Sequence, residues 1–129
     1  MKKDVAARED LIQILEAFYK KAYKDELIGR FFTDVVPLDL ETHIPDIADF
    51  WEGIVLNNFR YRKNVMEIHR HIHELSHIKK EHLDRWVQLF TETVSEQFEG
   101  NNAELMKQRA RSVATLMDIK LNHQGMGNG

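Results

Sequence analysis

Histidine is the residue type with the most versatile chemistry in this chain, and most of its copies lie in one segment. Five of the seven histidines fall between His69 and His82. Neutral imidazole is the commonest protein ligand of metal ions, and it titrates close to physiological pH. The clustering therefore predicts a metal or cofactor site in the middle of the chain.

Three residues of this segment have metal-ligand spacing. His73, Glu74 and His77 match the pattern H-E-x-x-H, in which two imidazoles one helical turn apart bind zinc and the glutamate is the general base of a hydrolase. Such a short pattern also arises by chance in a histidine-rich segment, and no predicted sheet would align a peptide beside it. A zinc-dependent hydrolase is one alternative, and a partly solvated helix edge without chemistry is another.

Length and composition limit the chain to one ordinary domain. Its 129 residues are 43% hydrophobic and 30% charged, so we expect a single globular domain over 1–129 with flexible tails at 1–7 and 122–129. The absence of cysteine excludes disulfides and thiolate metal sites. The net charge is −3, and residues of both signs are interspersed along the chain rather than gathered into blocks, which argues against a nucleic-acid partner. We find neither an apolar signal core nor the roughly 18 apolar residues of a membrane span, and we expect no membrane contact and a cytoplasmic location.

Apolar residues at three- and four-residue steps predict helices in the first half of the chain. The first helix covers 8–24, and Asp25 caps a short turn after it. Residues 33–41 are expected to form a loop, after which Thr42 caps a second helix with Pro45 in its first turn. The predicted buried stripe of this helix consists of Ile47, Trp51, Ile54 and Val55.

Three more helices are predicted in the second half. The first covers 65–76 and the second covers about 79–98, where Gly100 stands at the expected stop position. Asn102 is expected to cap the last helix, which runs to Leu121. No alternating run is long enough for a strand, and there is no internal repeat. The chain is therefore predicted to be all-α.

A second set of residues is dispersed over the chain in six segments: Phe18-Tyr19, Asp25 to Phe32, His43-Ile44-Pro45, Asp49-Phe50-Trp51, Tyr61 to His69, and His82 to Trp86. The order and spacing of these segments resemble those of truncated haemoglobins, and the resemblance covers about 11–121. The first two groups of that family typically carry Gly-Gly pairs, which this chain lacks, so it is most similar to the third group. The family implies a two-over-two helical sandwich around one haem b.

The resemblance implies that His69 is the proximal ligand, the one protein bond to iron. A single neutral imidazole leaves the sixth coordination site open to a diatomic gas. On a helix His71 points roughly 160° away from His69, whereas His73 lies within about 40° and is the competitor. The spacing between His69 and Trp86 favours His69 within the family pattern. Many family members have proline where Val65 stands, which leaves the start of this helix open.

The same resemblance implies a distal side and the walls of a haem pocket. Tyr19 and Trp86 match distal donors, a phenol and an indole N–H that can hydrogen-bond a bound ligand. His43 matches a distal histidine that swings between pocket and solvent, and an exposed position at a helix start is its alternative. Phe32, Ile47, Trp51, Met66 and Ile72 are the candidate haem walls, and Arg62, Lys63 and Arg70 are candidate partners of the propionates.

The chain is thus expected to bind oxygen, NO and CO at a five-coordinate iron, as a monomer. A strong donor pair would suit redox chemistry on oxygen, nitric oxide or peroxide, such as nitric-oxide dioxygenase or peroxidase-like activity. Turnover would need an electron donor, and the chain has no Gly-rich nucleotide motif, so the reductase would be a separate protein. The zinc hydrolase and a helical interaction module with incidental histidines are the alternatives.

Overall fold

The computed structural model describes residues 2–35, 40–58 and 77–123, and the helix predicted over 65–76 lies outside these ranges. The described residues form helices and connecting turns and contain no strand, which confirms the all-α prediction. The elements are α1 (Arg8–Lys24), the π-helical turn η1 (Phe31–Val35), α2 (Leu40–Val55), α4 (Lys80–Gln97), α5 (Asn101–Asp118) and the π-helical turn η2 (Ile119–His123).

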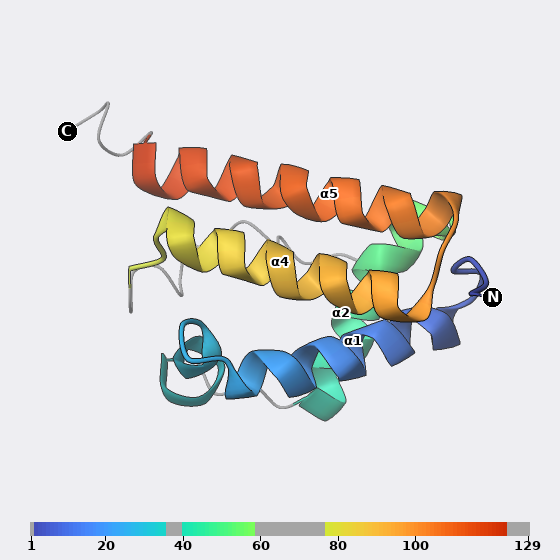
Figure 1. Ribbon diagram of the computed structural model, residues 1–129, viewed down its shortest axis with the longest axis horizontal. Coiled ribbons are helices and arrows are strands. Elements are labelled where there is room, and N and C mark those ends of the chain that lie inside the picture. Colours follow the sequence, from blue (N-terminus) through green and yellow to red (C-terminus); the bar gives the residue numbers. More distant parts are fainter. Residues whose placement is uncertain (1, 36–39, 59–76, 124–129) are drawn as a thin grey trace.

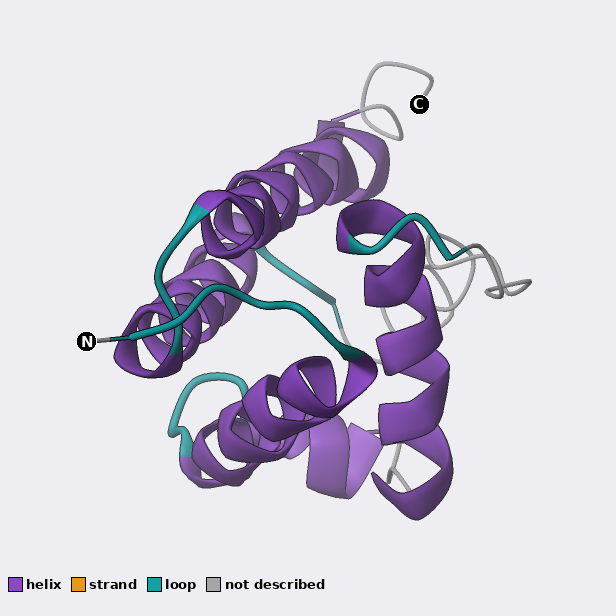
Figure 2. Cartoon of the chain, turned by 90° about the vertical axis from the view of Figure 1, so that its right-hand side faces the viewer, coloured by secondary structure: helices purple, strands orange, loops and turns teal. Residues whose placement is uncertain are grey.

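The four α-helices form two pairs that pack on each other. Helix α1 packs against α2, and α4 packs against α5; across the sandwich α1 contacts α4 and α2 contacts α5. Figure 1 shows α4 and α5 running antiparallel, with α1 beside α4. Figure 2 looks nearly along these three helices and shows α2 crossing them. This is the predicted two-over-two arrangement.

Helix α1 begins and ends where the sequence predicts. The carboxylate of Asp10 accepts hydrogen bonds from the N–H groups of Ala6 and Ala7 at 2.9 and 3.2 Å, which satisfies donors at the open end of the helix. Lys21 and Lys24 lie in the last turn, where a positive charge interacts favourably with the negative end of the helix dipole. The buried apolar face of the helix consists of Leu11, Ile14, Leu15, Phe18, Tyr19 and Ala22.

The turn after α1 is capped by Asp25, as predicted, and the same side chain also reaches α4. One carboxylate oxygen accepts from the N–H groups of Leu27 and Ile28, both at 3.1 Å, and the other accepts from Arg85 Nε at 2.7 Å. Partial burial raises the pKa of Asp25, but the Arg85 guanidinium and these N–H groups outweigh it and hold the pKa below its usual value. Asp25 therefore ties the end of α1 to the first half of α4 as a charged group.

Helix α2 begins earlier than predicted, so two expectations for it are wrong. It starts at Leu40, which places Thr42 inside the helix rather than at its cap and puts Pro45 at the sixth position. The helix forgoes the hydrogen bond that an N–H at residue 45 would donate within the helix. The Pro45 carbonyl also accepts a hydrogen bond from Arg8 Nη2 at 3.0 Å. Only Trp51 of the predicted stripe is buried; Ile47, Ile54 and Val55 are half-buried, and the buried face consists of Ile44, Ala48, Trp51 and Glu52.

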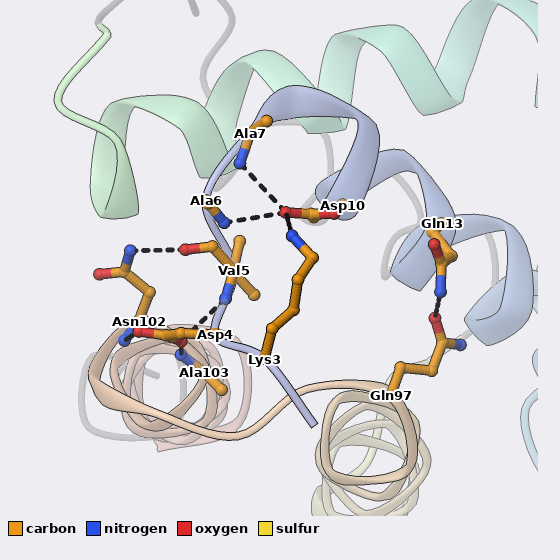
Figure 3. Close-up of polar contacts among 10 residues, drawn as sticks. All are labelled: Lys3, Asp4, Val5, Ala6, Ala7, Asp10, Gln13, Gln97, Asn102 and Ala103. Carbon is orange, nitrogen blue, oxygen red and sulfur yellow. Dashed lines mark hydrogen bonds and ion pairs between the residues drawn. The ribbon is translucent and has the colours of Figure 1, made fainter. Parts of the chain in front are cut away.

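The first turn of α5 is capped by a residue from the opposite end of the chain. Asp4 accepts hydrogen bonds from the N–H groups of Asn102 and Ala103, both at 2.9 Å (Figure 3). Asn102, the predicted cap, lies inside the helix, and its side-chain amide donates to the Val5 carbonyl at 2.8 Å. Gly100 has a φ of +146°, and a Cβ there would meet Asp4 Cγ at 2.5 Å, so both its conformation and its surroundings require glycine.

Residues 2–7, predicted as a flexible tail, are extended along the turn between α4 and α5. The side chain of Val5 is buried, and the Lys3 carbonyl accepts from the Glu99 N–H at 3.0 Å. The Lys3 ammonium lies 2.7 Å from the Asp10 carboxylate and 5.6 Å from the centre of the Phe98 ring. This segment therefore links the start of α1 to the α4–α5 pair.

Candidate functional site

Three of the residues predicted to form the distal side and walls of a pocket lie together between α1, η1 and α2. Tyr19 on α1 is 6% exposed, and its hydroxyl lies 2.6 Å from Nε2 of His43 on α2. The two rings meet edge to face at 5.3 Å between their centres. Phe32 in η1 presents its ring to Tyr19 in the same way at 5.7 Å. A buried phenol, a half-buried imidazole and an aromatic ring are therefore in direct contact.

The phenol of Tyr19 is held in its protonated form. Burial is the main cause that raises the pKa of Tyr19 well above its usual value, and the neighbouring Tyr23 raises it further. When the imidazole of His43 is neutral with an unprotonated Nε2, the phenol donates its hydrogen to that nitrogen. When the imidazole is protonated, Nε2–H donates to the phenol oxygen, and the phenol hydrogen can be donated elsewhere. The protonation state and the tautomer of His43 thus decide where the Tyr19 hydrogen points.

Trp86 on α4 belongs to a stack of three rings. Phe90, one helical turn later, lies nearly parallel to Trp86 with 18° between the planes and 5.9 Å between the centres. Trp51 of α2 lies on Phe90, at 13° and 5.1 Å. Offset stacks of this kind contribute about 0.5–1.5 kcal/mol per pair beyond the burial of the rings. The stack therefore joins the donor predicted on α4 to the wall residue predicted on α2.

Phe18 lies between the Tyr19 pair and the ring stack. Its ring meets Tyr19, Phe90 and Trp86 edge to face, with centre-to-centre distances of 5.1, 5.6 and 6.5 Å. Tyr19 and Trp86 are thus neighbours of one ring. Trp86 is half-buried, and its indole N–H makes no hydrogen bond within the described part of the chain.

The remaining predicted site residues are one described residue, Ile47, and six that lie outside the described ranges. Ile47 is half-buried on α2 and packs against the core. Outside the described residues lie His69, Met66, Ile72, Arg62, Lys63 and Arg70.

The zinc-hydrolase hypothesis gains nothing from the structure. His77 is exposed, and His73 and Glu74 lie outside the described residues. Within 2–35, 40–58 and 77–123, no three histidine or carboxylate side chains are grouped so that they could hold a metal ion.

A partly buried ion cluster fixes α2 against the start of α1. The Arg8 guanidinium contacts the carboxylates of Asp49, at 2.6 Å, and of Glu52, which is only 4% exposed. Hydrogen bonding to Glu52 raises the pKa of Arg8, against the opposing effect of burial. The second oxygen of Glu52 accepts from the Asn58 amide at 2.7 Å. The cluster joins α1, which carries Tyr19, to α2, which carries His43. It therefore helps to fix the relative position of these two residues.

The sequence pattern assigned no role in the site to Phe18 or Phe90, although Phe18 stands beside Tyr19 in a segment that matches the family. The spacing of Trp86 and Phe90 carries a signal, because residues four apart on a helix lie one above the other. The contact of Phe90 with Trp51 has no comparable signal, since it joins α4 to α2 over a separation that periodicity does not describe. Buried Glu52 was missed for the same reason, because its partner lies on α1.

The chain is similar in sequence and in fold to one group of haem proteins. It is 26% identical over 118 residues to the group 3 truncated hemoglobin ctb of Campylobacter jejuni subsp. jejuni, with 89% of this chain and 91% of that protein covered. The crystal structure of group III truncated hemoglobin from Campylobacter jejuni matches with a TM-score of 0.82 and 24% identity, over 96% of this chain and 98% of that one. No family model matches. The resemblance to the third group of truncated haemoglobins and the truncated-globin fold are confirmed.

These comparisons favour the haem-protein interpretation over the zinc hydrolase. None of the helices in the described part of the chain is long and apolar enough to cross a membrane.

Proposed function

We propose that this chain, with its truncated-globin fold, binds haem b and uses it to hold oxygen and related diatomic ligands such as NO and CO. The observation that carries the proposal is the contact between Tyr19 and His43. A phenol buried among aromatic rings, with one imidazole as its partner, is a donor kept for a small polar ligand in an apolar site.

The described residues fit a haem. A flat apolar macrocycle needs aromatic and aliphatic walls, and Phe32, Ile47 and Trp51 offer such side chains on η1 and α2. When bound, haem supplies an iron with one coordination position for a protein ligand and one for a diatomic molecule. The protein ligand is assigned to His69, on the strength of the resemblance and of the spacing from His69 to Trp86.

Tyr19 and Trp86 are assigned to retain the ligand. Each offers one hydrogen, from a phenol and an indole, and neither group loses its proton in the physiological range. A ligand that gains negative charge, as oxygen does, is retained by such donors more strongly than carbon monoxide. One charge-assisted hydrogen bond contributes about 1.5–3 kcal/mol, which is roughly 10- to 150-fold in retention.

His43 is assigned to control the phenol and the path to it. The imidazole rests against Tyr19 and is half-buried at an early position of α2. In this position a neutral ring competes with the ligand for the phenol hydrogen. Protonation makes the ring prefer water, and its outward movement would both open the path and free the phenol.

The test of the proposed function is the visible absorption spectrum of the purified chain. We expect a Soret band that shifts on addition of CO to the reduced protein, and elemental analysis that finds iron rather than zinc. A protein that binds no haem when haemin is added in equal amount would overturn the proposal. If that protein contained zinc, the hypothesis of a hydrolase built on His73, Glu74 and His77 would be favoured instead.

Use of the ligand in redox chemistry is a further part of the proposal. The paired donors suit turnover of nitric oxide or peroxide better than delivery of oxygen, and a separate cytoplasmic reductase would supply the electrons to this monomer. Consumption of NO by the oxygen-loaded protein, with nitrate as product, is the expected result. Release of oxygen faster than reaction with NO would contradict it.

A further inference from the structure

We infer that Phe90 is a positioning residue that sets the direction in which Trp86 can donate its indole hydrogen. The inference rests on the proposed function, in which Trp86 is a distal donor. Phe90 is 1% exposed, and its ring lies nearly parallel to that of Trp86, 5.9 Å from it. It is too deep in the core to meet solvent and acts through the ring above it.

The geometry of indole explains why a stacked neighbour matters. The N–H bond lies in the plane of the ring, so whatever fixes the plane also fixes the set of directions open to the hydrogen. Phe90 fixes the plane of Trp86 from one face. Phe18 meets Trp86 at 89°, and this edge contact opposes rotation of the indole about its own bonds. Two perpendicular contacts therefore restrain one donor.

Phe90 is itself held by α2. Trp51 of that helix, 3% exposed, stacks on Phe90 at 13° and 5.1 Å. A shift of α2 against α4 would therefore be passed through two stacked contacts to the indole on which ligand retention depends. The three rings make Trp86 a donor of fixed direction, although it is only half-buried.

The test replaces the Phe90 ring without emptying the core. Phe90→Leu keeps an apolar side chain but removes the flat face, and Phe98→Leu is the matched control. Phe98 is also a buried phenylalanine, 4% exposed, at the end of the same helix, and its ring meets the Lys3 ammonium. We expect Phe90→Leu to raise the oxygen dissociation rate by roughly two- to tenfold, the weight of one such aromatic contact, and Phe98→Leu to leave the rate unchanged.

A double substitution separates positioning from general loosening of the core. If Phe90 acts through the indole hydrogen, Phe90→Leu has no effect on the dissociation rate in the Trp86→Phe background. An equal rise in that background and in the wild type would overturn the inference. So would an unchanged rate in the Phe90→Leu single variant.

A readout that needs no haem keeps this inference distinct from the proposed function. The near-UV circular dichroism of Trp86, taken as the difference between each protein and its Trp86→Phe form, should shrink with Phe90→Leu and persist with Phe98→Leu. If the chain binds no haem, the proposed function fails while this spectrum still reports on the indole. Equal Trp86 bands in both leucine variants would overturn the positioning role.

Discussion

Removal of the Tyr19 hydroxyl and removal of the His43 ring should change ligand retention in opposite directions. In the structure the two groups are hydrogen-bonded to each other at 2.6 Å, so the phenol hydrogen is already in use when His43 is neutral with Nε2 unprotonated. A ligand gains this hydrogen only when the bond to the imidazole is given up. Tyr19 is therefore a donor to the ligand, and His43 is a competitor for that donor.

The magnitudes follow from the two hydrogen bonds. The bond to a ligand with negative character contributes about 1.5–3 kcal/mol, and the neutral bond between phenol and imidazole about 0.5–1.5 kcal/mol. Tyr19→Phe loses the difference, about 1–1.5 kcal/mol, and should speed oxygen dissociation by roughly 5- to 13-fold. His43→Ala loses only the competitor, and should slow dissociation by roughly 2- to 12-fold.

Stopped-flow displacement of oxygen by excess CO at pH 8, where an unperturbed histidine is neutral, measures both rates. His77→Ala is the matched control, because His77 is exposed and is not one of the three contacting residues Tyr19, His43 and Phe32. If His43→Ala speeds dissociation as Tyr19→Phe does, His43 is a second donor to the ligand and the reasoning is refuted. If Tyr19→Phe leaves the rate unchanged, Trp86 alone holds the ligand.

Three other results are expected. His69→Gly should lose haem or its normal coordination spectrum while His73→Ala keeps both, and the reverse would show that the proximal ligand is misassigned. Asp4→Asn should lower the free energy of unfolding at pH 7 by about 1–2 kcal/mol through loss of the charged α5 cap. Burial raises the pKa of Asp4, but its backbone hydrogen bonds outweigh burial and hold the pKa below its usual value. Urea titrations should therefore show the stability difference between Asp4→Asn and the wild type vanishing as pH falls through that lowered pKa. Ligand association after flash photolysis should quicken from pH 8 to pH 5, and a profile that survives in His43→Ala would mean that entry is controlled elsewhere.

The sequence was sufficient where helix ends depend on local chemistry. Helix α1 and the Asp25 turn follow directly from apolar spacing and a nearby carboxylate. The start of α2 was misplaced because proline statistics favour the first turn, whereas Pro45 is tolerated one turn later. The cap of α5 could not be found locally, since Asp4 lies 98 residues from Asn102 in the sequence.

In the candidate site, the sequence likewise predicted which residues take part but not all of the contacts between them. Family resemblance gave Tyr19, His43 and Phe32 as members of one site, and the structure brings these three into contact. It gave Trp51 and Trp86 as separate members, without the ring of Phe90 with which both stack. A pattern of matched positions carries residue types but no ring planes, and the direction of a hydrogen bond depends on those planes.

The pKa shifts separate the pH dependence of the fold from that of the ligand site. Partial burial raises the pKa of Asp4 and Asp25, but their hydrogen bonds hold both below the usual value, so the stability they give is present at neutral pH and is lost in acid. Burial lowers the pKa of His82, whose Nδ1 accepts the Lys79 N–H at 2.9 Å, so this cap of α4 stays neutral, and its contribution to stability also falls on acidification. Tyr19 has a raised pKa and keeps its proton at alkaline pH. None of these groups changes charge between pH 7 and 8, and the expected quickening of ligand association on acidification is assigned to His43, the imidazole in contact with the donor.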